Sequence, residues 1–261
     1  MRIGFVHGVM NTDNMSILGL TIDYGPYGWI DNYDPDWTPN TTDMQGRRYR
    51  FGWQPQVAYW NLSRLAGALS SLFATPEPLQ EGLQRYRDVY AAADRTNIAA
   101  KLGLSVWREG DTALMERLQT LMQSGEIDMT LMFRALAELD REDPSVDSLG
   151  DVFYDPQKRI EVAPRLQAWL REYAARLADD GLDNNASRVL MNAVNPRFVL
   201  RNYLVQQVID RAEQGDMTGI VELLDVMRHP YDEQRGKEAF AAKRPDWARD
   251  RAGCSMLSCS S

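Results

Sequence analysis

The fold of this chain is decided by the stretch His7-Gly8-Val9-Met10-Asn11-Thr12-Asp13-Asn14, followed by Ser16-Ile17-Leu18-Gly19-Leu20-Thr21-Ile22 and then Asp23-Tyr24-Gly25. The middle run is short, apolar and bounded by turn formers, so it predicts a strand or a tight hairpin. Asn14 and Asp23 stand at its two ends. A tight loop followed by a short hairpin can bring an amide oxygen and a carboxylate to one hard, oxygen-seeking cation. The stretch therefore predicts a metal site with Asn14 and Asp23 as ligands.

The order of these residues matches that of a protein-kinase active site. Kinases carry the catalytic loop H-R-D-L-x-x-x-N and later D-F-G, and the Asn and the D-F-G Asp hold magnesium ions that bridge nucleotide phosphates. Here Asn14 follows His7 at the same interval, and Asp23 opens Asp-Tyr-Gly. The kinase base would lie two residues after the histidine, where Val9 cannot accept a proton. This disfavours a conventional phosphotransferase, and Asp13 becomes the nearest available base.

Each part of the pattern also has an ordinary structural explanation. Asp-Asn and Asp-Tyr-Gly occur routinely in turns. A single histidine such as His7 is more often a buried structural residue than a catalytic one. The joint pattern, in the kinase order and with a strand-like run in between, is what favours a kinase-like magnesium site.

The rest of the chain predicts a mainly α-helical body. Residues 24–54 are a long aromatic-rich segment that we interpret as an ordered loop. From Gln56 onward, apolar residues recur at helical spacing. After a first helix that stops at Thr75-Pro76-Glu77-Pro78, we expect helices near 80–102, 111–124, 128–139, 164–179, 186–192, 197–214 and 217–227, with Asp111, Asp128 and Asp216 as N-caps. Pro144 to Pro156 has the composition of a linker.

Composition and charge exclude several classes of protein. The formal charge is −8, and no dense Lys/Arg run is present, so we expect no nucleic-acid partner. No run of 18 apolar residues occurs, so we expect no membrane partner. The chain has 2 cysteines, Cys254 and Cys259. This low number suits a reducing compartment, and we expect a bacterial cytoplasm.

Several motifs spread over the chain resemble those of one family. The blocks that carry the likeness are His7–Ser16, Gly19–Gly28, Gln54-Pro55-Gln56, Trp60-Asn61-Leu62, Asn195-Pro196-Arg197, Leu200–Leu204, Pro230–Gln234 and the end Ser258-Cys259-Ser260-Ser261. Together they are similar to the SelO/YdiU family of protein adenylyltransferases. The resemblance implies a kinase-like fold that binds ATP in a flipped orientation and transfers AMP to Ser, Thr or Tyr hydroxyls of other proteins.

The resemblance also implies roles for particular residues. Asp13 would accept the proton of the attacking hydroxyl, while Asn14 and Asp23 would bind Mg²⁺ or Mn²⁺, with Asp23 also lying against the nucleotide. ATP would be the substrate, and proteins with Ser, Thr or Tyr hydroxyls would be the acceptors. A carboxylate beside a metal site can serve as such a base.

The resemblance further implies a division of the chain. Residues 1–54 would form the catalytic loop, metal-site hairpin and activation-type loop of a kinase-like C-lobe, residues 55–230 its helical body, and residues 231–261 a poorly ordered tail. Family members are about twice this long, and their N-lobe would fall outside these 261 residues. We therefore expect this shortened chain to be inactive or incomplete. The alternative is a non-catalytic helical interaction module or a decayed fragment.

The two cysteines carry weaker expectations. Some relatives have a cysteine in the loop after Asp-Tyr-Gly that could pair with the tail, but here Pro39 holds the corresponding place, which leaves a redox latch in doubt. The spacing of Cys254 and Cys259 is a poor zinc motif because only His7 and His229 could assist. A solvent-exposed thiol pair that oxidises locally is the better interpretation.

Overall fold

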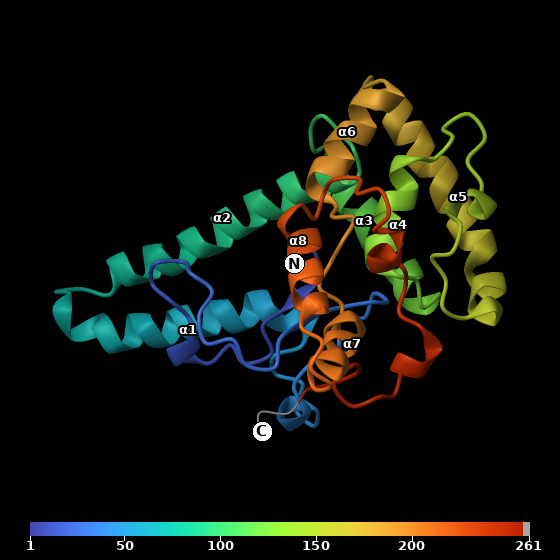
Figure 1. Ribbon diagram of the computed structural model, residues 1–261. Coiled ribbons are helices and arrows are strands. Elements are labelled where there is room, and N and C mark those ends of the chain that lie inside the picture. The colour runs from blue at the N-terminus through green and yellow to red at the C-terminus, as the bar shows by residue number, and fades with distance from the viewer. Residues whose placement is uncertain (258–261) are drawn as a thin grey trace.

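Eight α-helices follow a short strand-and-loop segment in residues 1–257, the part of the chain that the computed structural model describes (Figure 1). They are α1 (Gln54–Leu69), α2 (Glu77–Lys101), α3 (Asp111–Ser124), α4 (Met129–Ala137), α5 (Pro156–Asp180), α6 (Asn184–Val194), α7 (Asn202–Ala212) and α8 (Thr218–Arg228). The strands β1 (Phe5–Val6) and β2 (Gly28–Trp29) form one antiparallel sheet. This confirms a mainly helical chain with a small sheet near its N-terminus. Over the same residues, no helix combines the length and apolar character needed to cross a bilayer.

The largest apolar core is built around α3 and α5. Leu118 and Met122 of α3 are fully buried, because the apolar residues of this helix recur on one face. From α5, Trp169 and Tyr173 stack with their ring centroids 5.0 Å apart. The indole nitrogen of Trp169 donates to the carbonyl of Leu114 at 2.9 Å, so the buried polar group is satisfied. Burying each such side chain contributes about 1.5–3 kcal/mol.

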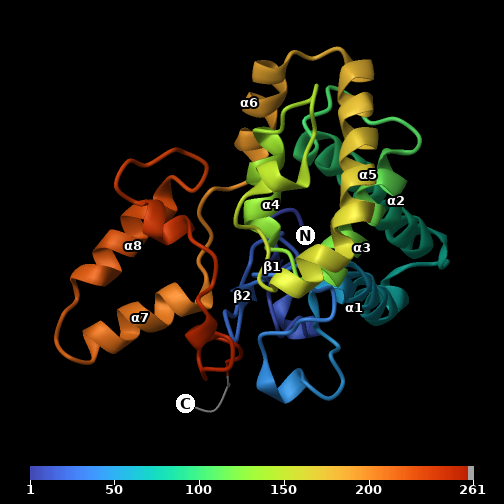
Figure 2. The same ribbon diagram turned by 90° about the vertical axis from the view of Figure 1, so that its right-hand side faces the viewer.

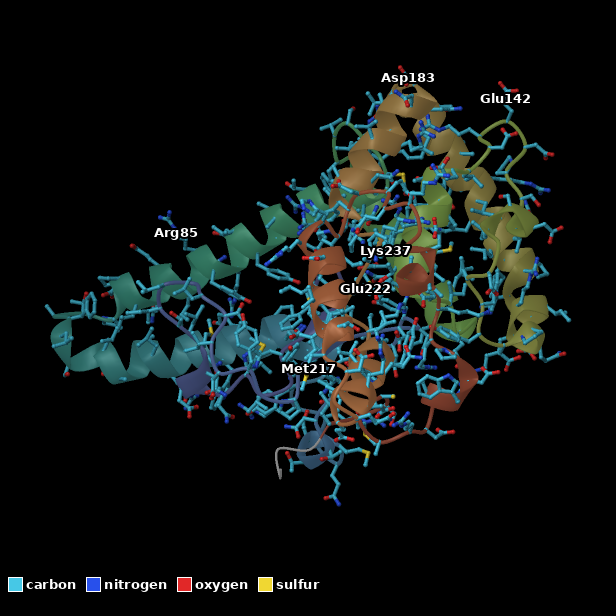
Figure 3. The ribbon with its side chains drawn as sticks, viewed as in Figure 1. Arg85, Glu142, Asp183, Met217, Glu222 and Lys237 are labelled. Carbon is cyan, nitrogen blue, oxygen red and sulfur yellow. The ribbon has the colours of Figure 1, made fainter. Side chains whose placement is uncertain are left out.

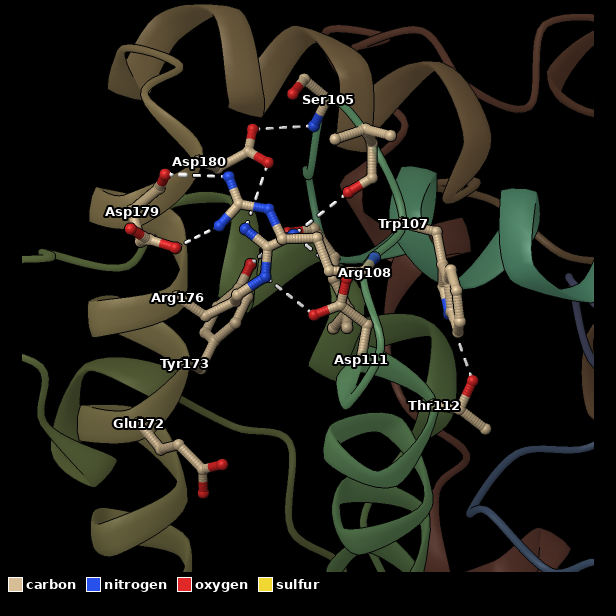
Figure 4. Close-up of polar contacts among 12 residues, drawn as sticks. Ser105, Trp107, Arg108, Asp111, Thr112, Glu172, Tyr173, Arg176, Asp179 and Asp180 are labelled. Carbon is tan, nitrogen blue, oxygen red and sulfur yellow. Dashed lines mark hydrogen bonds and ion pairs between the residues drawn. The ribbon is translucent and has the colours of Figure 1, made fainter.

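A polar network ties α5 to the start of α3 (Figure 4). Arg176 Nε donates to Asp111 at 2.8 Å, and a second nitrogen donates to Asp180 at 3.2 Å. The hydrogen bond that Arg176 donates to Asp111 is the main reason that the pKa of Arg176 is raised. The prediction that Asp111 caps α3 is wrong, because the N-cap is Gly110 and the Asp111 carboxylate is used by Arg176.

Two helices begin at positions that differ from the predicted ones. Helix α5 starts at Pro156 instead of near residue 164, because Asp155 caps it and proline fits the first helical turn. The linker-like break therefore ends at Asp155. Helix α7 starts at Asn202 instead of near Arg197, whose backbone N–H donates to Pro230 O at 2.8 Å in a non-helical segment.

The N-terminal sheet does not lie where the sequence predicts a strand. Phe5 pairs with Trp29 across β1 and β2, so the sheet encloses the loop and turn between them. The predicted strand or hairpin, residues 16–22, is a turn closed by one isolated antiparallel bridge between Met15 and Thr21. The side chains of Ile17, Leu18 and Leu20 are exposed, and a strand pair with no buried face is marginally stable.

Helices α7 and α8 form a hairpin beside the main helical body (Figure 2). The C-terminal segment packs on this hairpin through η6 (Glu238–Ala241) and η7 (Asp246–Ala248), and Leu257 N donates to Pro39 O at 2.7 Å. Over residues 231–257 the structure thus differs from the expected poorly ordered tail, because small apolar side chains in this segment are buried. The remaining tail residues, 258–261, lie outside the described part of the chain.

Candidate active site

His7 ties the start of the predicted catalytic loop to the residue before Asp23. The ring is buried, its Nε2 lies 2.9 Å from Ile22 O, and Val9 N donates to its Nδ1 at 3.4 Å. A neutral imidazole with its hydrogen on Nε2 satisfies both contacts at once. His7 is therefore a structural histidine, the ordinary alternative that the sequence left open, and its bond to Ile22 positions Asp23.

Gly8 permits the loop to cross the segment that follows Asp-Tyr-Gly. Its φ of +78° is left-handed, and a Cβ at this position would lie 2.1 Å from Pro26 O. The amide of Asn40 also donates to Gly8 O at 3.3 Å. No residue with a side chain fits this crossing without a backbone shift. The loop and the segment after Asp-Tyr-Gly are thus held in close contact.

The turn between the loop and Asp-Tyr-Gly brings the two predicted metal ligands to one end. Asn14 precedes Met15 and Asp23 follows Thr21 by two residues, so the Met15–Thr21 bridge places both at the open end of the turn. Asn14 Nδ2 donates to Val9 O at 2.9 Å, which fixes the orientation of the amide. Asp23 is exposed and has a φ of 55°, a left-handed conformation that is uncommon outside glycine and often marks functional turns.

Asp13 lies in η1 (Thr12–Asn14), directly before Asn14, and its side chain is exposed. Among residues 1–257 it takes part in no ion pair. An unpaired carboxylate at the surface is accessible to a hydroxyl that arrives from another protein. The structure thus brings Asp13, Asn14 and Asp23 to one loop and turn, and their chemical roles stay predictions. Within the described residues, no cluster of three or more His, Cys, Asp or Glu side chains could hold a metal ion by itself.

Two amide side chains of α1 hold the backbone of the catalytic loop through hydrogen bonds. This role was not predicted from the sequence. Gln54 Oε1 accepts from His7 N at 3.1 Å, and its Nε2 donates to Phe5 O at 2.9 Å. Asn61 Nδ2 donates to Met10 O at 3.0 Å. Both amides lie on the buried face of an amphipathic helix, where a polar side chain needs a hydrogen-bond partner. This position was the signal in the sequence that could have predicted their contacts. They hold the loop backbone that carries Asp13.

A buried ionic cluster anchors the long loop after Asp-Tyr-Gly to the helical body. Arg201 is fully buried and donates to Asp31 at 2.7 Å and to Asp128 at 2.8 and 3.0 Å. Burial by itself would lower the pKa of Arg201, but the charges of Asp128 and Asp31 raise it well above its ordinary value. Asp128 also caps α4, as predicted, through a bond from Leu131 N at 3.0 Å. Removing one partner would leave a buried charge uncompensated.

Cys254 is buried against the α7–α8 hairpin. The expectation of a solvent-exposed thiol is therefore wrong for this residue, and burial is the main reason that its pKa is raised. Cys259 lies outside the described residues, so the expected pairing of the two thiols stays a prediction.

Comparison with known proteins identifies the class to which these features belong. Proteins named "Protein nucleotidyltransferase YdiU" match all 261 residues, with 66% identity in Xanthomonas axonopodis pv. citri, 67% in Xanthomonas euvesicatoria pv. vesicatoria and 64% in Xanthomonas campestris pv. campestris. These relatives are, by name, protein nucleotidyltransferases.

The family itself is shown by a second match. Residues 1–228 match the sequence model of the family described as "Protein adenylyltransferase SelO". The chain belongs to the SelO family, as its motifs predicted. It spans about half the length of the curated relatives, since each match covers 100% of the chain and 50% of the relative.

Proposed function

We propose that this chain supplies the catalytic loop and metal-binding turn of a protein adenylyltransferase, which transfers AMP from ATP to Ser, Thr or Tyr hydroxyls of other proteins. The observation that carries the proposal is the turn between Asn14 and Asp23. Asp13 and Asn14 come directly before this turn, and Asp23 comes directly after it. The Met15–Thr21 bridge and the His7–Ile22 hydrogen bond hold its two ends together. Membership of the SelO family supports the same class of reaction.

In the proposed reaction, the oxygen of the acceptor hydroxyl attacks the α-phosphorus of ATP. A new phosphorus–oxygen bond forms, and the bond to the oxygen that bridges to the β-phosphate breaks. Pyrophosphate leaves with the electron pair of that bond. The hydroxyl proton passes to the carboxylate of Asp13, which acts as the general base. Val9, at the position of the kinase base, cannot take this proton.

Asn14 and Asp23 would hold the metal ion, which we propose to be Mg²⁺ or Mn²⁺. Asn14 directs its Nδ2 to Val9 O, which leaves Oδ1 as the ligand atom, and Asp23 offers a carboxylate. Mg²⁺ prefers such oxygen donors and usually takes only one or two from protein, with phosphates and waters completing its shell. The donor set therefore fits the ion. When bound, the ion would neutralise charge that develops around the α and β phosphates.

We also propose that the helical body is the C-lobe of a kinase-like fold, on the strength of the order of loop, turn and Asp-Tyr-Gly. In kinase-like enzymes the phosphates are positioned by groups from two lobes. The part of the curated relatives outside the match, about half of their length, would contribute the other groups of the nucleotide site.

Labelling with two forms of ATP tests the reaction. The chain is joined to the unmatched part of the Xanthomonas axonopodis relative and incubated with Mg²⁺, a protein acceptor and ATP labelled on either the α- or the γ-phosphate. We expect α-label on protein that is lost in Asp23→Ala and kept in Glu142→Ala, a control at an exposed carboxylate far from the turn (Figure 3). Label from the γ-phosphate would indicate a kinase. No label from either would favour the non-catalytic interaction module.

A further inference from the structure

A basic and aromatic surface borders the loop that carries Asp13. Between Asp43 and Glu77 the sequence has 4 arginines (Arg47, Arg48, Arg50 and Arg64) and no acidic residue, although the chain as a whole has a charge of −8. This segment runs from the end of the long loop through α1 to the start of α2. A positive region this close to the proposed base, on an otherwise acidic protein, produces a local field that attracts anionic groups.

Two of these guanidinium groups lie on one exposed indole ring. The Cζ atoms of Arg48 and Arg64 are 4.3 and 5.0 Å from the centroid of Trp60, which is 39% exposed. Neither arginine forms an ion pair with a carboxylate in residues 1–257, whereas Arg50 is paired with Asp36 at 3.0 Å. An arginine stacked on an aromatic face is held in place and keeps its edge N–H groups for a carboxylate.

This surface, defined as Arg48, Trp60 and Arg64, is connected to the catalytic loop through two residues next to it in the sequence. Tyr49, next to Arg48, donates from its hydroxyl to the side chain of Asn11. Asn61, next to Trp60, donates to the backbone oxygens of Met10 and Asn11 at 3.0 and 3.3 Å. Both residues contact the part of the loop that leads directly into Asp13.

Arg64 also lies beside the loop at a cavity. It lines a mostly apolar cavity of about 580 Å³ together with Thr12, the neighbour of Asp13, and with Leu62 and Leu65 of α1. A segment that binds the arginines would therefore pass close to Asp13 with room for an apolar side chain beside it. This is the position expected for residues that flank an acceptor hydroxyl.

We propose that Arg48, Trp60 and Arg64 form a specificity surface that binds an acidic segment of the protein substrate next to the hydroxyl to be modified. The inference rests on the proposed function, because it states which charge the substrate carries next to the hydroxyl that the same site modifies. A protein segment is favoured over nucleic acid because two unpaired arginines match one or two carboxylates. Nucleic-acid binding typically neutralises a longer series of phosphates.

Peptide binding without ATP or metal tests the surface separately from the reaction. Two fluorescent peptides are compared by anisotropy: one has a serine flanked by glutamates and an apolar residue, and the other has glutamine at each glutamate position. We expect the chain to bind the glutamate peptide more tightly, with a preference that weakens as salt is added. In the double variant Arg48→Gln/Arg64→Gln we expect this preference to fall about tenfold, since two exposed ion pairs with the peptide would be lost.

Two further variants provide the controls. Arg85→Gln removes an exposed arginine that projects from α2 (Figure 3) and should keep the full preference. Trp60→Leu leaves both charges in place but removes the ring, and we expect an intermediate loss. Equal binding of the two peptides, or an unchanged preference in the double variant, would overturn the proposal, as would tighter binding of a single-stranded oligonucleotide. If α-label transfer still depends on Asp23 in that case, the specificity surface alone is wrong.

Discussion

The ring of His7 lies 2.9 Å from the backbone oxygen of Ile22, and this bond connects the first residue of the catalytic loop to the residue before Asp23. The side chain is buried, and its other nitrogen accepts from Val9 N. One imidazole therefore connects the start of the loop that carries the proposed base to the residue before one proposed metal ligand. His7 therefore contributes to the site through its structure, without taking part in the chemistry.

Replacing His7 by leucine should lower the free energy of unfolding by about 1–3 kcal/mol, because Ile22 O and Val9 N would be left without their partner. Urea unfolding followed by circular dichroism measures this change. The matched control is His229→Leu, because the side chain of His229 is 68% exposed and should change stability little. Equal effects of the two substitutions would show that the His7 bonds do not hold the loop.

A pair of glycine substitutions tests the crossing of the two segments. Gly8 and Gly19 have similar left-handed φ values of +78° and +73°, but a Cβ would meet Pro26 O at 2.1 Å in the first and nothing within 4 Å in the second. Gly19→Ala should therefore show the conformational penalty alone, about 1–2 kcal/mol. Gly8→Ala should add the clash and destabilise by a further 1–3 kcal/mol, roughly the range for overpacked sites. Similar losses in urea unfolding would contradict the observed crossing.

Lys101 should make stability depend on pH. Its Nζ donates to Arg2 O at 2.9 Å and to Asn195 Oδ1 at 2.7 Å, and no described carboxylate forms an ion pair with it. Burial, with the nearby charge of Arg2, lowers the pKa of Lys101 from 10.5 to about 7. Between these two pH values the unfolded chain binds more protons than the folded one, so this contribution to stability rises with pH.

Comparison with Lys101→Met isolates the effect of this lysine. From pH 7 to 9, the unfolding free energy of the unmodified chain minus that of the variant should increase, by at most about 1.4 kcal/mol per pH unit. The control is Lys237→Met, since Lys237 pairs with Glu222 at 2.6 Å on the surface (Figure 3). Its difference should stay nearly flat over the same range. A flat difference for Lys101 as well would mean that this lysine remains charged in the folded protein.

The 261-residue chain by itself should label protein acceptors weakly or not at all. Positioning of reacting groups can be worth roughly 7–11 kcal/mol of a barrier, and the proposed site uses only Asp13, Asn14 and Asp23 from this chain. The chain extended with the unmatched part of a curated relative should label robustly under the same conditions. Strong Asp23-dependent labelling by the 261 residues alone would show that they contain the whole site.

The sequence predicted the elements whose signals are local. The helices were found because their apolar residues recur on one face, and Asp128 was recognised as a cap because capping depends on the next few residues. Asn14 and Asp23 stand at the two ends of one turn, as the sequence predicted, and their role as metal ligands stays a prediction. The family was recognised from motifs, which carry more information than periodicity.

Features that depend on distant partners could not be predicted in this way. Arg201 is buried only because Asp31 and Asp128 reach it from two other elements. The packing of the tail up to Leu257 depends on Pro39, whose backbone oxygen accepts from Leu257 N and which lies more than two hundred residues earlier in the chain. A strand, one of the two alternatives expected at 16–22, did not form for a related reason, because the side chains of Ile17, Leu18 and Leu20 are exposed and offer no buried face to a strand.

The most direct test of the account separates nucleotide binding from AMP transfer at two neighbouring carboxylates. In the extended chain, the rate of α-label transfer and the affinity for ATP with Mg²⁺ are measured for Asp13→Ala and Asp23→Ala. Asp13→Ala should lose most transfer, by a factor of about 10²–10⁴, and still bind the nucleotide, because it removes only the base. Asp23→Ala should lose both, because it removes a metal ligand. Full transfer activity in Asp13→Ala, or unchanged nucleotide affinity in Asp23→Ala, would contradict the proposed site.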